Sequence, residues 1–141
     1  MKRNQWKLGL LAVLLVATLT GCGKTGSDKL TLEGTWVGFD EGAPSQRMRA
    51  MFGDGRFAYW DAQTNSLGYG TYVLNETVKP AQIDLVFETS QNPAYVGKKA
   101  LGIYEFQGNQ LKMAGNQPGN PERPTSFVGT ETTRVLSWKR E

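Results

Sequence analysis

The stretch QRMRAMFGDGRFAYWDA, residues 46–62, predicts two antiparallel strands joined by a tight turn. Its first half alternates, so that Met48, Ala50 and Phe52 share one face while Arg47, Arg49 and Met51 share the other. A period of two is that of a strand with one buried face. The Gly-Asp-Gly sequence at 53–55 is a turn signal, and the remainder forms the returning strand. The stretch therefore indicates a β-sheet with an apolar inner face.

The same strand signals recur on both sides of this hairpin. Gly108-Asn109 marks a second turn, and the three prolines of residues 117–124 mark a loop. Because no segment with helical periodicity separates the strands, βαβ units are excluded. The further predicted strands are residues 30–36, 67–75, 81–89, 98–107, 110–114 and 132–140.

About eight strands joined mostly by short hairpins predict an up-and-down meander. A meander of this length removes its unpaired edges only by closing on itself. We therefore expect an all-β, antiparallel up-and-down barrel of about eight strands, formed by residues 30–141. The interior of such a barrel is just wide enough for packed side chains or for one small ligand.

The N-terminus has the pattern of an export signal. Lys2, Arg3 and Lys7 form a basic start, and the uncharged run 8–20 is shorter than the about 20 residues that span a bilayer. Leu19-Thr20-Gly21-Cys22 then resembles the bacterial lipobox. The resemblance implies that residues 1–21 are a signal peptide and that Cys22 becomes the lipid-bearing N-terminus.

A lipid on Cys22 implies a protein held at the cell envelope, on the exported side of the membrane. Residues 22–29 are small and polar, as expected of a flexible tether. Gly23 follows Cys22, which by resemblance to lipoprotein sorting signals favours an outer membrane where the cell has one. The alternative is an ordinary secreted protein with a single thiol. In either case we expect a monomer.

The composition excludes several classes of function. Removal of the leader leaves thirteen basic side chains beside 13 acidic ones, so a broad basic surface for nucleic acid is not supported. The chain has no histidine and a single cysteine, so we expect no disulfide, no metal site, no cofactor and no Ser-His-Asp chemistry. Asp84 and Glu88 are better explained by an exposed strand face than by acid–base catalysis. We do not expect an enzyme.

Gly34-Thr35-Trp36 in the first predicted strand resembles the Gly-x-Trp signature of lipocalins. In that family the tryptophan plugs one end of the barrel and an arginine near the last strand packs over it. The resemblance implies that Trp36 is the plug and that Arg140, or else Arg134, makes a cation–π contact with it.

Further motifs follow in order and resemble a family of small uncharacterised bacterial domains, described as lipocalin-like and known mainly from planctomycetes. The resemblance covers most of residues 30–138 and implies a fold without an established activity. Relatives often carry a cysteine where this chain has Met113 and Ala114. The motifs are Gly70-Thr71-Tyr72, Lys79-Pro80 leading to Ile83-Asp84-Leu85, Gly102-Ile103-Tyr104-Glu105, Gly108-Asn109-Gln110-Leu111-Lys112 and Arg123-Pro124-Thr125.

The aromatic side chains line a ligand cavity or fill the core, and the sequence leaves both possibilities open. The candidate ligand-binding residues are Trp36, Tyr59, Tyr69, Tyr104 and Arg123, the three tyrosines being expected to face inward. Two functions therefore remain: binding of a small apolar or amphipathic ligand, or a structural and protein-interaction module without a cavity.

Overall fold

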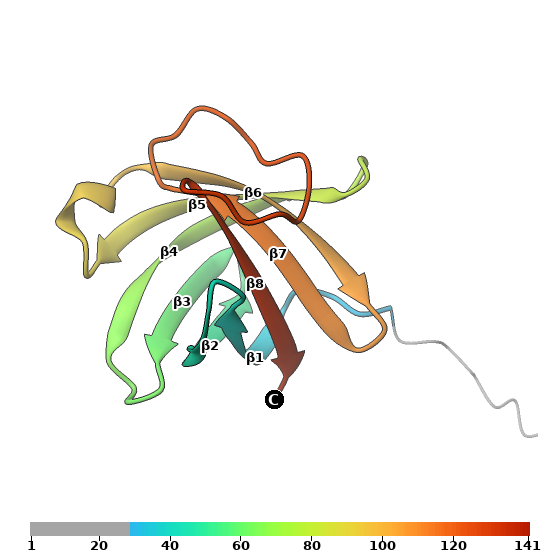
Figure 1. Cartoon of the computed structure of the whole chain (residues 1–141), viewed down its shortest axis with the longest axis horizontal. Helices are drawn as coiled ribbons and strands as arrows, with labels where there is room; N and C mark the ends of the chain where they lie inside the picture. The colour runs from blue at the N-terminus through green and yellow to red at the C-terminus, as the bar shows by residue number, and fades with distance from the viewer. Residues whose placement is uncertain (1–28) are drawn as a thin grey trace, which may run out of the picture.

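Eight antiparallel strands, each paired with its neighbours in sequence order, form a closed barrel (Figure 1). The computed structural model describes residues 29–141, so the predicted signal peptide, Cys22 and most of the tether lie outside the described residues. The predicted all-β up-and-down barrel is confirmed. Its elements are β1 (Gly34–Asp40), β2 (Ala43–Gly53), β3 (Arg56–Asp61), β4 (Ser66–Asn75), β5 (Ala81–Ser90), the short 3₁₀ helix η1 (Pro93–Tyr95), β6 (Lys99–Gln107), β7 (Gln110–Asn116) and β8 (Thr133–Arg140).

The barrel closes through the pairing of β1 with β8, in which Trp36 faces Arg140 and Asp40 faces Leu136. The hairpin at residues 46–62 forms as expected, with Phe52 opposite Phe57 and Ala50 opposite Tyr59. Closure leaves neither terminal strand with a free edge, which is how an antiparallel meander avoids edge-to-edge association.

One end of the barrel is crossed by the incoming chain. Residues 30–33, predicted to begin the first strand, instead precede β1, and Leu32 is buried within the main core. The change of direction falls at Gly34, whose φ of 131° suits a residue without a Cβ. We call this end the closed end, and the opposite end the mouth. The closed end is on the right in Figure 1.

The core has two parts because the long β7–β8 connection, residues 117–132, folds back on the outer wall. The main cluster fills the barrel and includes Trp36, Phe52 and Trp138. The second cluster joins Ile103 and Val135 on the outside of the sheet beneath this connection. In Figure 1 the connection, in orange and red, arches over β5 and β6. A barrel wall covered on both faces is less solvated than a free one.

Candidate ligand-binding site at the barrel mouth

Trp36 seals the closed end. Its side chain is 0% exposed and its indole Nε1 donates to the Leu32 carbonyl oxygen at 2.8 Å. The Arg140 guanidinium lies 4.8 Å from the ring centroid and also donates to the Thr31 carbonyl at 2.6 Å. The contact predicted between Trp36 and Arg140 is therefore present, whereas Arg134 lies at the mouth. With these partners in place, Trp36 is a structural plug.

Aromatic rings fill the half of the barrel next to this plug. Phe106 stacks on Trp36 with the ring centroids 6.2 Å apart, and Tyr104 meets Phe106 edge-on at 6.0 Å. Tyr104 is 2% exposed, and its hydroxyl donates to Glu76 at 3.0 Å. Burial, and then the hydrogen bond to this carboxylate, raise the pKa of Tyr104. The interpretation of the aromatics as core therefore holds for this half.

The mouth half differs because it keeps an apolar cavity of about 280 Å³. Its walls come from five strands. Its rim comes mainly from the end of β5 and the β5–β6 connection that carries η1, and Arg134 of β8 completes it. Asn92 holds this rim by accepting a hydrogen bond from the Ala94 N–H at 3.0 Å. The wall residues are Met48, Tyr59, Leu67, Phe87, Leu136 and Trp138; the rim residues are Ser90, Gln91, Asn92, Tyr95 and Arg134.

Two side chains of the wall carry polar atoms of interest. Tyr59 lies parallel to Trp138, with a ring-centroid separation of 6.0 Å and an interplanar angle of 14°. Trp138 is 1% exposed, and its Nε1 has no hydrogen-bond partner among residues 29–141. An unpaired buried N–H costs about 1–3 kcal/mol. Burial also raises the pKa of Tyr59, so its hydroxyl stays neutral near pH 7. The cavity wall thus holds the Trp138 ring, whose Nε1 is itself buried, and a neutral hydroxyl on Tyr59.

A second, smaller void adjoins this cavity through shared wall residues. It measures about 50 Å³ and has Tyr59 and Leu136 in common with the mouth cavity. Gly115 also lines it, and a Cβ at that position would meet nothing within 4 Å. The mouth half therefore contains two adjoining voids.

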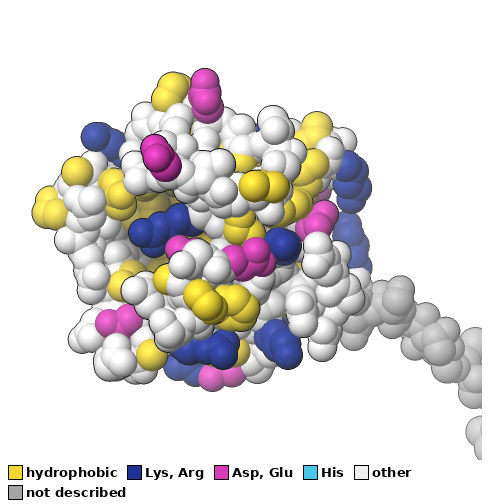
Figure 2. Space-filling model, viewed as in Figure 1, with side chains coloured by type: hydrophobic (Ala, Val, Ile, Leu, Met, Phe, Trp, Pro, Cys, Tyr) yellow, Lys and Arg dark blue, Asp and Glu magenta, His cyan; other side chains and the backbone are white. Residues whose placement is uncertain are grey.

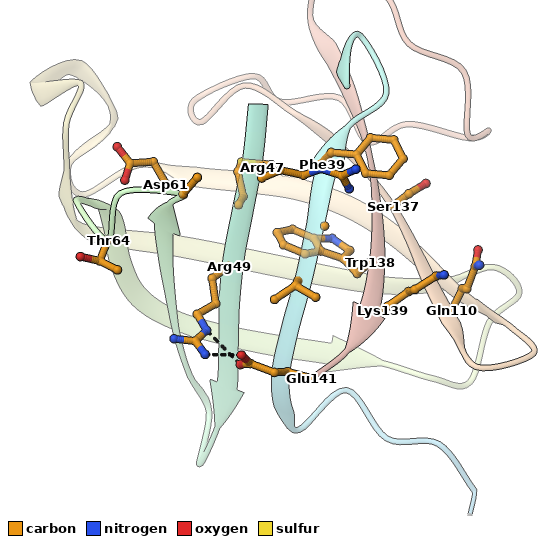
Figure 3. A pocket seen from close by; sticks show the side chains of 14 residues that line it. Phe39, Arg47, Arg49, Asp61, Thr64, Gln110, Ser137, Trp138, Lys139 and Glu141 are labelled. Carbon is orange, nitrogen blue, oxygen red and sulfur yellow. Dashed lines mark hydrogen bonds and ion pairs between the residues drawn. The ribbon is translucent and has the colours of Figure 1, made fainter. Parts of the chain in front are cut away.

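A larger hollow of about 680 Å³ lies along β1, β2 and β8 (Figure 3). Two of its arginines have partners: Arg49 forms a bidentate ion pair with Glu141, and Arg47 lies 5.1 Å from the centre of the Phe39 ring. The indole of Trp138 reaches from β8 to Gly38 of β1, where a Cβ would lie 2.6 Å from the ring. Recognition of an apolar ligand is better served by the mouth cavity, because its lining is the more apolar of the two.

Of the residues predicted to bind a ligand, Tyr59 alone lines the mouth cavity. The expectation that Tyr69 faces inward is wrong, since it is 42% exposed on the outer wall. Gly68 and Gly70 take the neighbouring inward positions, so alternation turns Tyr69 outward.

Arg123 lies on the outer wall and not at the mouth. It donates to the Gly102 carbonyl at 2.7 Å and to Asp84 at 2.6 Å, and so ties the loop down. These contacts stabilise the loop, and they do not place Arg123 at the ligand cavity.

Sequence reasoning missed Trp138, Leu136 and the η1 rim. The first two share an inward face of β8 with Arg140, and the alternation Leu136-Ser137-Trp138-Lys139 could have revealed them. The rim depends on how a connecting segment folds over the barrel end, for which the sequence carries only the Asn92 cap and Pro93 as local signals.

No family model, curated protein or solved structure matches this chain. Within residues 29–141, no helix has the length and apolarity needed to cross a bilayer, and no three His, Cys, Asp or Glu side chains come together as a possible metal site. On the face shown in Figure 2, basic and acidic side chains are interspersed.

Proposed function

We propose that this protein is a lipid-anchored envelope protein whose barrel binds one small apolar or amphipathic ligand at its mouth. The observation that carries the proposal is the apolar mouth cavity of about 280 Å³, with the Tyr59 and Trp138 rings in its wall. Cavities for drug-sized ligands begin near 300 Å³, and one of about 150 Å³ accepts benzene. The ligand is accordingly a compact molecule of about one or two rings, or a short chain of similar bulk.

The anchor is supported by the lipobox alone, which makes Cys22 the attachment site. Two or more acyl chains hold a protein at a bilayer stably, because each buried methylene contributes about 0.8 kcal/mol. Labelled palmitate should enter the wild-type chain in a bacterial host and should not enter Cys22→Ser. Equal labelling of the wild type and Cys22→Ser, or no labelling of the wild type, contradicts the lipid anchor. Neither result bears on ligand binding by the barrel.

Ligand binding can be tested with phenylbutanol, an uncharged probe of suitable bulk. We use the mature chain, residues 22–141, with Cys22→Ser to keep it unacylated, and measure heat on titration. Leu67→Trp should abolish binding because the larger ring occupies the mouth cavity that Leu67 lines. The matched control is Val73→Trp, which places the same ring on the exposed outer side of the same strand.

Wild-type protein and Val73→Trp should bind the probe alike. If the wild type releases no heat and protects no mouth residue in NMR titrations, the mouth is not a ligand site. Native mass spectrometry of protein from its own host then identifies the natural ligand where the probe binds.

A protein-interaction module is the second candidate, and one observation favours it. Met51, Ala58 and Tyr69 lie directly opposite one another across β2, β3 and β4 on the outer wall, and Met51 and Tyr69 are exposed. A row of exposed apolar side chains on a sheet suits a partner surface. Crosslinking in cells from Tyr69 to one partner, with no ligand extracted from the barrel, would favour this function over ligand binding.

A further inference from the structure

The charge at the mouth points to the chemistry of the ligand, and this step rests on the proposed function. Among the side chains that line the mouth cavity, Arg134 alone is charged. It stands at the rim, two and four residues before Leu136 and Trp138, which line the same cavity from the same face of β8. A single strand thus presents a cation at the entrance and apolar surface below it.

The guanidinium of Arg134 is only loosely engaged. Its ion pair with Asp40 has an N–O distance of 3.6 Å, which is longer than a hydrogen bond, and its side chain is 75% exposed. Asp40 directs its other oxygen to the Gly42 N–H at 2.9 Å. Arg134 therefore keeps N–H donors for a further acceptor.

Arg56 and Arg123 are more fully committed than Arg134. Arg56 donates to Glu88 at 2.7 Å, and Arg123 donates to Asp84 at 2.6 Å as well as to two carbonyls. Glu41, the neighbour of Asp40, is held by Ser137 at 2.7 Å and by Lys112 at 3.2 Å. Because Glu41 is engaged by these two residues, Asp40 is the acid that pairs with Arg134. The N–O distance of 3.6 Å makes this ion pair weak.

We propose that the mouth selects ligands with an apolar body and one carboxylate head, the head meeting Arg134 at the rim while the body enters the cavity. A guanidinium offers two parallel N–H groups to a carboxylate, which gives both strength and orientation. The polar rim residues Ser90, Gln91 and Asn92 surround the same entrance with hydroxyl and amide groups. An uncharged molecule of equal bulk contacts the apolar walls of the cavity but forms no ion pair with Arg134.

The test compares phenylbutyrate with phenylbutanol, which share the same ring and chain length. In calorimetric titrations at low salt, wild-type protein should bind the acid up to about fivefold more tightly than the alcohol, since an ion pair with a largely exposed guanidinium is screened by water. Arg134→Gln should remove this preference, whereas Arg134→Lys should retain part of it. Arg49→Gln, which removes a paired arginine on the outer wall, is the matched control and should retain the full preference.

Asp40→Asn provides an independent variant, because it removes the carboxylate that competes for Arg134. It should raise the affinity for phenylbutyrate and leave that for phenylbutanol unchanged. Arg134 is largely exposed, so thermal unfolding should show Arg134→Gln folded as the wild type is.

The outcomes separate the two proposals. Equal binding of acid and alcohol by the wild type, or an unchanged preference in Arg134→Gln, overturns the selection of carboxylates and leaves the ligand site intact. Binding of neither probe overturns the ligand site itself.

Discussion

At the scale of single residues, the closed end depends on one ring and the contacts made around it. Trp36 is fully buried, bonded through its Nε1 and covered by Arg140. Trp36→Ala should lower the free energy of unfolding by about 3–5 kcal/mol, because it leaves a cavity that rigid strands cannot fill. Urea denaturation measures this loss. Trp60→Ala, at a partly exposed site on β3, is the control and should cost less; a loss near zero for Trp36→Ala would show that the ring is no plug.

Gly70 lies where β4 and β5 approach too closely for any side chain. A Cβ there would lie 1.8 Å from the Val86 carbonyl oxygen of β5, and backbone cannot swing away as a side chain can. Gly70→Ala should therefore destabilise the barrel by about 1–3 kcal/mol. Gly115→Ala is the matched control, because its Cβ would enter open space. Equal melting temperatures for both variants would contradict the close approach of β4 and β5.

At the scale of elements, the 117–132 connection acts as a cover fastened by Arg123. The guanidinium reaches two carbonyls and Asp84, and the fastened segment shields the second core cluster. Arg123→Gln should cost about 1.5–3 kcal/mol, the usual contribution of hydrogen bonds to a charged group. Amide exchange should quicken within 117–132 and in β6, and should stay unchanged in β2. Equal amide exchange in the wild type and in Arg123→Gln would mean that Phe127 and the apolar contacts hold the segment without Arg123.

The strands were predictable from sequence, and the site was predictable only in part. Alternation places Met48, Ala50 and Phe52 inside, and Arg49 and Met51 between them outside, because a half-buried sheet imposes a period of two. The same rule fails to say which half of the barrel is left unfilled. That outcome depends on the small residue at Gly115 and on the η1 rim, which are set by packing across strands that are distant in sequence.

At the scale of the whole molecule, the buried tyrosines make the fold sensitive to alkali. The folded-state pKa of Tyr104 is raised, chiefly by burial, so the unfolded chain loses this proton first as the pH passes about 10. Stability is thus fully present below that pH and declines above it. Tyr104→Phe should flatten the decline relative to Tyr69→Phe, as measured by urea midpoints between pH 8 and pH 11. An equal decline in both variants would contradict the assignment.

The chain enters the barrel at the plugged end, and this determines the orientation of the mouth relative to an N-terminal anchor. Thr31 and Glu33 are bonded beneath Arg140, so the polypeptide leaves the domain at the pole opposite the cavity. If Cys22 is acylated as proposed, the tether of about seven residues keeps that pole close to the lipid and turns the entrance toward the aqueous compartment. The ligand would then enter the mouth from the aqueous compartment, from dissolved carriers or enzymes, and not directly from the bilayer.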